Sequence, residues 1–364
     1  MPATIVRADP VDRPSQDPTL VPFDVEITTK PSPERWDEFV RGHAAAGGYH
    51  LWGWRGVFEA AFGHETIYLS AEQGGAIVGV LPLVIFESRL FGRFAVSLPF
   101  VDGGGLCVRD AQVGRMLIDR AAAIADDKRL SHVELRHTSR QRPELPVRQH
   151  KVGMSLRLGS ESGEAWAALD RKVRNQVRKA EKSGLVERRG GAELLDAFYD
   201  VFARNMRDLG TPVYSRAFFE HVVGTFADSS TIFLVDHGGQ TVAAAIALVH
   251  GDTLAVPWAS SLREYRAQSP NNLLYWRIIE HAIHSGLATL DFGRSTPGEG
   301  TFQFKEQWGA RPSPLHWEYV LRPGAQLPDL STKNPRYRAA IAAWKRLPVP
   351  LTRVLGPHIV RSIP

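Results

Sequence analysis

The segment from 291 to 312 combines residue types that could do chemistry at a partly buried site. It reads DFGRSTPGEGTFQFKEQWGARP and places Lys305 between Phe304 and Trp308, after a glycine-containing loop. The two aromatic residues are four positions apart, so both can face inward from a short helical or irregular segment. We expect their burial to hold Lys305 at a cleft, where an ammonium group can bind an anion or stabilise an oxyanion. With a pKa lowered by burial it could also accept a proton. A surface lysine whose stem packs on Trp308 is the alternative.

The residues just before this lysine are predicted to lead into the same cleft. Residues 289–293, TLDFG, have the composition of a strand, and RSTPGEG after them is typical of a turn. We predict Asp291 as a second catalytic residue and Arg294 as a substrate-binding residue. The histidines of the chain show no metal-ligand spacing, so we expect no metal.

A row of basic residues indicates a binding surface for phosphate. Four cations at spacings of three, four and four share one face of a helix predicted over 165–183. The opposite face carries an apolar stripe, and Gly184 is predicted to end the helix. The cations are Arg171, Arg174, Arg178 and Lys182, and the stripe is Trp166, Leu169, Val173, Val177 and Ala180. We predict that Arg174 and Arg178 bind the pyrophosphate of a nucleotide- or lipid-linked sugar, because arginine binds phosphate through two parallel hydrogen bonds. A solvated helix face is the alternative.

Three further residues are candidates for substrate contact. Tyr214 and Trp258 lie near a predicted loop and a strand end, and Asn271 begins a predicted helix. Packing is the alternative for the two aromatic residues. For Asn271, or for Asn272 beside it, the alternative is the N-cap of the helix.

The elements that would position these residues occur twice along the chain. Residues 67–84 read as strand, turn and strand around Gly74-Gly75, and residues 232–249 do the same around Gly238-Gly239. Other elements recur in the same order: helices at 49–63 and 214–227, third strands at 93–100 and 253–260, helices at 114–128 and 272–286, and fourth strands at 132–136 and 289–293. We therefore predict two α/β domains of one architecture, each with a mixed, mostly antiparallel sheet flanked by helices.

The predicted division of the chain has four parts. Residues 1–21 are expected to be a disordered lead, 22–160 the first domain, 161–325 the second domain and 326–364 a basic amphipathic tail. The tail has seven Lys or Arg residues and no acid after Asp329. It is expected either to lie on an anionic membrane surface or to pack back onto the second domain through Tyr337, Ile341 and Trp344. Its prolines are expected to prevent one long helix.

Composition limits the class of protein. Apolar residues make up 43% of the 364-residue chain and charged residues 23%, as in globular proteins. A single cysteine, Cys107, excludes an internal disulfide framework and fits a reducing compartment. No apolar run is long enough to cross a bilayer. We therefore expect a cytoplasmic protein, in contact with a membrane only at its surface if at all.

Three motifs carry a family resemblance. They are RKVRNQVRKAEKSGL at 171–185, PNNLLYWRIIEHAIHSG at 270–286, and DFGRS…FKEQWGARPSPLHWEY at 291–319. The order of elements in each half resembles the GNAT-type N-acyltransferase fold, and the doubled arrangement resembles the Fem-type aminoacyltransferases. The segments at 81–100 and 344–357 resemble the subgroup associated with exosortase and exopolysaccharide gene clusters.

The resemblance implies transfer of an acyl or aminoacyl group to an amine of a cell-envelope or exopolysaccharide precursor. It implies no tightly bound cofactor; acyl-CoA or aminoacyl-tRNA would be the co-substrate, and the acceptor a small, lipid-linked or nucleotide-linked molecule. The sequence departs from both donor patterns. RAQSPN at 266–271 has Ser269 where loops that bind CoA carry glycine, and Asn271 where they carry glycine or alanine. The long helical hairpin of tRNA-using relatives is also missing from the sequence. A non-catalytic scaffold protein of the same machinery is the alternative function.

Overall fold

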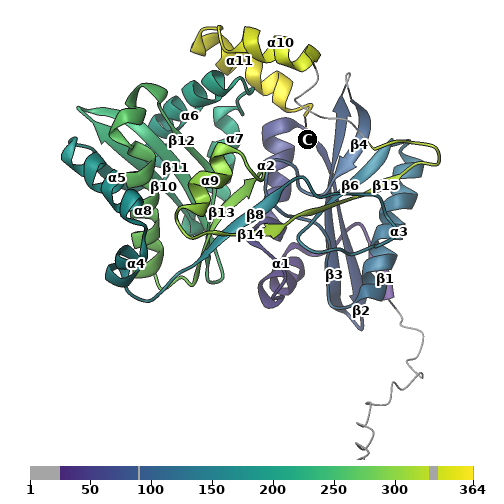
Figure 1. Ribbon diagram of the computed structural model, residues 1–364. Coiled ribbons are helices and arrows are strands. Elements are labelled where there is room, and N and C mark those ends of the chain that lie inside the picture. Colours follow the sequence, from purple (N-terminus) through teal and green to yellow (C-terminus); the bar gives the residue numbers. More distant parts are fainter. Residues whose placement is uncertain (1–24, 89–90, 328–334, 364) are drawn as a thin grey trace, which may run out of the picture.

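Two β-sheets flanked by helices make up the computed structural model, which describes residues 25–88, 91–327 and 335–363 (Figure 1). Each sheet is mixed and mostly antiparallel, so the predicted fold class of two α/β domains is confirmed. The predicted lead over 1–21 lies outside the described residues.

The first sheet has the strand order β1-β2-β3-β4-β6-β15-β7, with β5 paired to β3. The elements of the first half are β1 (Val25–Thr28), α1 (Pro33–Gly42), a 3-10 turn (Gly48–His50), α2 (Gly53–Phe62), β2 (Glu65–Gln73), β3 (Ala76–Ser88), β4 (Gly92–Val96), β5 (Cys107–Val108), α3 (Ala111–Asp127), β6 (His132–His137) and β7 (Val147–Arg148).

The second sheet has the order β14-β8-β13-β12-β11-β10-β9. Its half contains β8 (Val152–Arg157), α4 (Ser162–Ala168), α5 (Arg171–Lys182), β9 (Val186–Gly190), α6 (Leu195–Leu209), α7 (Arg216–Thr225), β10 (Ser230–His237), β11 (Gln240–His250), β12 (Thr253–Ser261), a 3-10 segment (Arg263–Gln268), α8 (Pro270–His284), β13 (Thr289–Ser295), α9 (Gly300–Glu306) and β14 (Arg311–Pro314). Strand β15 (His316–Leu321) and helices α10 (Pro335–Trp344) and α11 (Val349–Val360) follow.

The predicted repeat is present in detail. The hairpins β2–β3 and β10–β11 turn at Gly74-Gly75 and Gly238-Gly239, and both pairs have φ values of 56° and 81°. Positive φ at two consecutive residues is the type I′ geometry that glycine adopts without strain. Each first strand also has a bulge just before its turn, between Ala71 and Glu72 and between Val235 and Asp236. In each half a parallel strand pair follows, β4 with β6 and β12 with β13.

Two predicted elements differ from the structure. The third strand of the first half, predicted over 93–100, ends at Val96, and Leu98 and Phe100 have φ values of 51° and 68°. Left-handed backbone at these positions cannot continue an extended strand. The helix predicted over 165–183 is divided into α4 and α5, because Leu169 is extended and the Asp170 side chain caps a new helix by accepting from the Lys172 N–H at 2.6 Å. Gly184 ends α5 with φ 77°, as predicted.

The two halves meet through an aromatic core. Helices α2 and α7 pack against each other between the sheets (Figure 1). The Trp54 ring of α2 lies 5.0 Å from Phe226 and 6.5 Å from Trp258, so residues of both halves share one buried cluster. On the outer faces, α3 covers the first sheet, and α5 and α8 cover the second. Burial of this shared aromatic area fixes the two halves relative to each other.

Each sheet takes a strand from beyond its own half. Strand β8 precedes residue 160 but pairs with β13 of the second sheet. Strand β15 follows the second half but pairs with β6 of the first sheet, His316 opposite His137. The domain bounds 22–160 and 161–325 remain a proposal for the folding units, and the structure shows only which strands pair.

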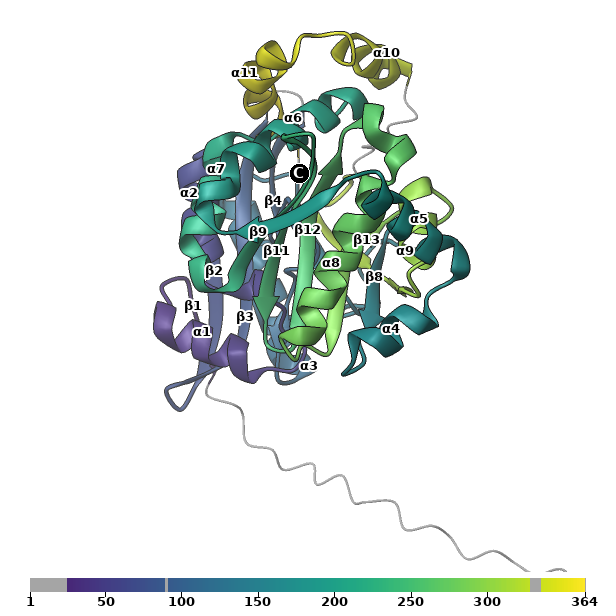
Figure 2. The same cartoon turned by 90° about the vertical axis from the view of Figure 1, so that its left-hand side faces the viewer.

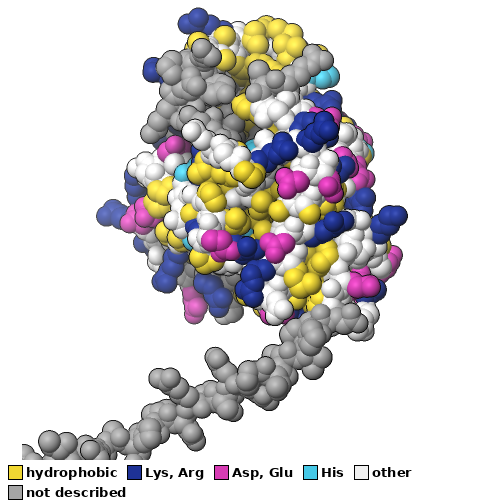
Figure 3. All heavy atoms as spheres, turned by 90° about the vertical axis from the view of Figure 1, so that its right-hand side faces the viewer, with side chains coloured by type: hydrophobic (Ala, Val, Ile, Leu, Met, Phe, Trp, Pro, Cys, Tyr) yellow, Lys and Arg dark blue, Asp and Glu magenta, His cyan; other side chains and the backbone are white. Residues whose placement is uncertain are grey.

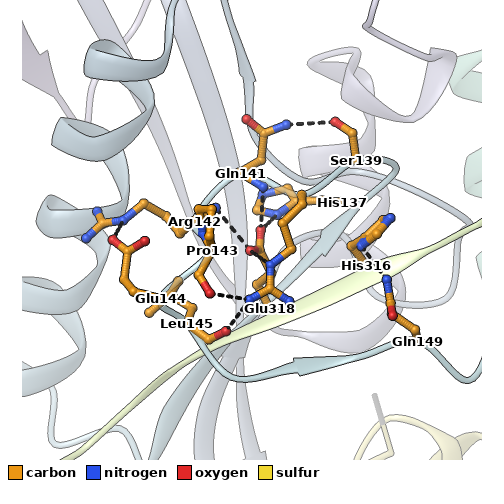
Figure 4. Close-up of polar contacts among 11 residues, drawn as sticks. His137, Ser139, Gln141, Arg142, Pro143, Glu144, Leu145, Gln149, His316 and Glu318 are labelled. Atoms are coloured by element: carbon orange, nitrogen blue, oxygen red, sulfur yellow. Dashed lines mark hydrogen bonds and ion pairs between the residues drawn. The ribbon is translucent and has the colours of Figure 1, made fainter.

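The buried carboxylate of Glu318 fixes β15 to the first half (Figure 4). It has no exposed surface and accepts from His137 Nδ1 at 2.6 Å and from the backbone N–H groups of Gln141 and Arg142 at 3.0 Å each. The Arg140 guanidinium lies 3.2 Å away. Burial acts to raise the pKa of Glu318, but the hydrogen bonds from His137 and the two N–H groups outweigh it and lower the pKa.

The C-terminal segment forms two helices at one end of the molecule, beside α6 (Figures 1 and 2). Pro348 separates them, so the expected interruption by proline is confirmed. Trp344 is buried, and Ile341 lies against Gly210 at the end of α6. Arg353 forms an ion pair with Asp200 of α6 at 2.6 Å. This part of the tail therefore packs onto the second half; the Tyr337 side chain lies outside the described residues.

We expect Glu318→Gln to lower the free energy of unfolding by about 2 kcal/mol, because an amide has one acceptor oxygen where the carboxylate uses both. Urea unfolding at neutral pH measures the loss. Glu144→Gln is the control: its side chain is 57% exposed, and its pair with Arg142 should contribute less than about 0.5 kcal/mol.

The free energies of unfolding of the wild type and of Glu318→Gln should become equal at low pH. The folded-state pKa of Glu318 is lowered, so its contribution is present above the unfolded-state pKa and disappears as the pH falls through the folded value. A stability difference between wild type and Glu318→Gln that does not shrink toward low pH would contradict this account.

Candidate active site

The strands β12 and β13 separate at the centre of the second sheet. Their parallel pairing covers Thr253 with Thr289, Leu254 with Leu290, and Ala255 with Asp291, and it ends there, although both strands continue. Beyond this point the backbone N–H and C=O groups of β12 and β13 do not bond to each other, so they can bind other partners. Asp291, a predicted catalytic residue, is the last paired residue before the strands separate.

A bulge in β13 turns its backbone toward this opening. The register with β8 shifts between Asp291 and Arg294, and Gly293 has φ 72°. The Gly293 N–H donates to Asp291 Oδ1 at 2.8 Å. The carbonyls of Gly293 and Arg294 accept hydrogen bonds from Lys305 Nζ at 3.1 and 2.9 Å. The lysine of α9 is thus bound to the bulge.

An aspartate of the first half, Asp102, also lies in this opening. Asp102 lies in the loop between β4 and β5, and its carboxylate accepts from the Arg294 N–H at 2.9 Å and pairs with Arg294 Nε at 3.1 Å. A Cβ on Gly293 would be 2.6 Å from Asp102 Oδ2 and 3.7 Å from the Val256 carbonyl of β12. Asp102 therefore sits between the separated strands of the other half. Asp102 is not among the residues predicted for the site, and the glycine-rich stretch VDGGGLC around it is the signal that the sequence offers.

The buried charges perturb one another. Burial lowers the pKa of Lys305 to about 8, with Arg294 acting in the same direction and Asp102 and Asp291 acting against it. Burial raises the pKa of Asp291 to about 6; Asp102 adds to this, while the Gly293 N–H and Lys305 oppose it. Both groups therefore titrate near neutral pH, where proton transfer is most efficient. At pH 7 the predominant state is an ionised Asp291 beside a protonated Lys305.

A cavity of about 520 Å³ lies between the halves and reaches both carboxylates. Its lining includes Tyr49, His50, Trp54, Asp102, Ala255 and Asp291. The Tyr49 hydroxyl is buried and has no hydrogen-bond partner among the described residues, and burial raises its pKa well above the usual value, with Asp102 and Asp291 adding to the effect. His50 donates to or accepts from backbone groups at both ring nitrogens, and burial lowers its pKa to about 4. The cavity thus offers a phenol, a neutral imidazole and two carboxylates.

Lys305, Asp291 and Arg294 of the predicted site lie together at the bulge of β13, and of these three residues Asp291 alone lines the cavity. Trp258 is buried and packs edge-on against Phe218 and Phe219 at 5.4 and 5.3 Å, as in the packing alternative. Tyr214 packs in the same cluster. Burial raises the pKa of its hydroxyl; the charge of Arg294 lowers this pKa, and the charge of Asp102 raises it.

Arg174 and Arg178 lie on α5, on the outer side of the second sheet. Arg178 is exposed and lies 5.5 Å over the Trp166 ring. A groove of about 1070 Å³ runs between α4, α5, α8 and α9, but neither arginine lines it or the cavity between the halves. Their predicted role in binding phosphate stays a prediction.

Asn271 is not the N-cap of α8. Ser269 holds that position with φ 61°, followed by Pro270 at the first helical position, which proline favours. The Asn271 side-chain oxygen is buried and has no partner among the described residues. Within the same part of the chain, no group of three or more His, Cys, Asp or Glu side chains gathers as metal ligands.

Comparisons with known proteins agree with this architecture. A family model described as an acetyltransferase (GNAT) domain matches residues 168–306. Residues 168–306 form a GNAT domain. Through this domain the chain is a GNAT-type acyltransferase, with its donor open. No curated protein sequence matches the chain.

Solved structures extend the likeness to the whole chain. FemX superposes with a TM-score of 0.65 at 14% identity, covering 80% of this chain and 97% of FemX. A tandem GNAT protein from the clavulanic acid biosynthesis pathway gives 0.52 at 13%, covering 81% and 97%. L-PGS from Bacillus licheniformis gives 0.53 at 12%, covering 91% and 99%. The chain therefore has the Fem-type tandem GNAT fold; its resemblance to the exosortase-associated subgroup stays a prediction.

We expect Asp102→Asn to lower the pKa values of both Asp291 and Lys305, because the Asp102 carboxylate raises both. NMR titration of selectively labelled aspartate and lysine measures the two shifts. Glu306→Gln is the control: Glu306 is exposed next to Lys305, yet it does not act on either pKa. Equal shifts in the two variants would show that Asp102 is not the dominant neighbouring charge.

Proposed function

We propose that this GNAT-type acyltransferase moves an acyl or aminoacyl group to an amine of a cell-envelope or exopolysaccharide precursor, in the cavity between its halves. The observation that carries the proposal is the pair Asp291 and Lys305, which titrate near 6 and 8 at the point where β12 and β13 separate. Binding energy for the acceptor would come from the cavity, which is lined by both halves.

In the proposed reaction the acceptor amine attacks the carbonyl carbon of the donor. A C–N bond forms, and the C–S bond of a thioester or the C–O bond of an ester breaks. The proton of the attacking nitrogen passes to Asp291, whose raised pKa makes the carboxylate a stronger base than usual. From there it reaches the departing thiolate or alkoxide, so the carboxylate is regenerated.

Lys305 is the proposed oxyanion partner. Two of its three N–H bonds donate to the Gly293 and Arg294 carbonyls, which fixes the direction of the third. A fixed ammonium N–H in a buried site stabilises negative charge on the former carbonyl oxygen without reorganisation. Two carboxylates, Asp102 and Asp291, help to keep the ammonium protonated.

The donor is proposed to be acyl-CoA or aminoacyl-tRNA, with no cofactor held tightly. The segment before α8 contains no glycine between Arg263 and Asn272, and Ser269 takes the left-handed conformation that glycine would adopt more readily. A pyrophosphate at this place would therefore meet side chains as well as backbone. The acceptor is proposed to be a small, lipid-linked or nucleotide-linked amine.

We also propose that the protein works in the cytoplasm and reaches the inner face of the membrane at its surface. A membrane-linked acceptor requires such a position. The basic tail supports it, because seven cations and no acid follow Asp329.

A non-catalytic scaffold of the same machinery is the second candidate. One observation favours it: Asp102 and Lys305 already bind the β13 backbone groups that a donor could contact between the separated strands. A scaffold would bind the acceptor without turnover. Isothermal titration with acetyl-CoA and with a nucleotide-linked amino sugar, combined with mass spectrometry of the product, separates the two functions.

We expect Lys305→Met to lower kcat by about a hundred- to a thousandfold, the usual effect of removing one oxyanion donor. Methionine keeps the length of the buried side chain and removes its charge and hydrogen bonds. Lys172→Met, at the rim of the outer groove, is the matched control and should retain full activity. Unchanged kcat in a folded Lys305→Met protein would rule out this role.

The pH dependence of kcat/KM is expected to be bell-shaped. Activity should rise as Asp291 loses its proton near pH 6 and fall as Lys305 loses its proton near pH 8. In Asp102→Asn both limbs should move to lower pH, since both pKa values fall. A profile that is flat from pH 5 to 9 would be inconsistent with Asp291 and Lys305 as the titrating groups.

A further inference from the structure

Helix α11 carries apolar side chains on the face that points away from the protein. The described chain has six exposed large hydrophobic side chains, and four of them belong to this helix. They are Leu351 (42% exposed), Val354 (63%), Leu355 (39%) and Ile359 (39%). Spacings of three and four residues place them on one side of a helix. Figure 3 shows hydrophobic side chains gathered at the top of the molecule, where the C-terminal helices lie.

The opposite face of α11 is the one that packs. Thr352, Gly356 and Val360 recur every four residues and are buried. A Cβ on Gly356 would lie 2.8 Å from the Val213 backbone nitrogen, so the helix approaches the second half closely at this glycine. The ion pair between Arg353 and Asp200 holds the same side. Because packing already occupies one face, the outer apolar face needs a different partner.

The charge of the C-terminal segment that contains α11 identifies the kind of partner. The chain after Asp329 has seven Lys or Arg residues and no Asp or Glu. Arg338, Lys345, Arg346 and Arg361 are exposed, and in the described structure none of them forms an ion pair. Two copies of the chain meeting through α11 would bring these cations together and repel each other. An anionic surface attracts the cations while the apolar side chains enter it.

We propose that the outer face of α11 docks on an anionic phospholipid bilayer. A short helix with an apolar face beside cations lies in the membrane interface, where apolar side chains reach the acyl boundary and cations meet headgroup phosphates. In the described residues, α11 and every other helix fall short of the length and apolar content that crossing a bilayer requires. Docking therefore holds the protein at the surface.

The test measures sedimentation of the full chain with vesicles, without any substrate. Vesicles of phosphatidylcholine alone are compared with vesicles that also contain phosphatidylglycerol, at low and high salt. We expect binding to the anionic vesicles at low salt, and about tenfold weaker binding for Val354→Glu, which puts a charge in the docking face. High salt should weaken binding of the wild type.

Val186→Glu is the matched control. Val186 is 65% exposed on β9, so both variants replace an equally exposed valine and change the net charge equally. The control should bind like the wild type, and both variants should keep the melting temperature of the wild type. Equal loss of binding in the two variants, or no binding of the wild type to anionic vesicles at low salt, overturns the proposal. So does a wild-type dimer in solution that Val354→Glu dissociates, since the face would then bind a second copy. Because no substrate is present, these outcomes are independent of the proposed transfer reaction.

Discussion

The exchange of strands between the two sheets is the constraint on which the rest of the structure depends. Strand β15 pairs with β6 over six residues and also with β7, so the chain that leaves the second half completes the first sheet. Its register fixes two neighbouring side chains. Glu318 binds the turn after β6, while the Trp317 ring lies 4.4 Å from the Arg136 guanidinium and 5.7 Å from that of Arg294. One strand thereby positions arginines of both halves on a single ring.

The same arrangement places four charges at one partly buried position: Lys305 is buried, while the side chains of Arg294 and Asp102 remain 30% and 13% exposed. Asp102 and Asp291 face Arg294 and Lys305, so the cluster contains two anions and two cations. Buried ion pairs contribute little to stability once desolvation is counted, and removing one member is costly because it leaves an unpaired charge. The energy that keeps the halves together comes instead from the aromatic cluster around Trp54 and Trp258. That cluster allows Asp102 to reach into the other half.

Local signals made much of the fold predictable from the sequence. Paired glycines and alternating strands are short-range features, so both hairpins and the doubled order of elements follow from them. The break between α4 and α5 was not predicted, because the apolar spacing continues across Leu169 and hides the capping role of Asp170. The N-cap of α8 was missed because a serine with positive φ carries no sequence signal, although Pro270 marks the first turn.

Contacts between residues distant in the sequence limited how much of the site could be predicted. Lys305 and Asp291 were predicted because they belong to one continuous segment of the chain. Asp102 was missed because 192 residues separate it from Arg294, and no local pattern encodes such a contact. The partner of β15 was missed for the same reason, since 181 residues separate Glu318 from His137. Contacts between residues far apart in the sequence, such as those of Asp102 and Glu318, are therefore the part of the structure that the sequence alone does not predict.

The internal repeat places a carboxylate at the same position of each half, but with different partners. Glu134 and Asp291 are equivalent, because each is the last residue of its strand to pair in parallel, with Val96 and Ala255. In the first half, Glu134 binds Arg136 Nε two residues later at 2.8 Å and accepts from the Tyr319 hydroxyl at 3.0 Å.

In the second half, the bulge at Gly293 adds one residue before the arginine. Arg294 consequently pairs with Asp102 instead of Asp291, and Asp291 keeps only the Gly293 N–H and the more distant Lys305. An aspartate that loses its arginine in a buried place must have a raised pKa. A single inserted glycine thus turns a structural ion pair of the first half into a carboxylate that titrates near neutral pH in the second.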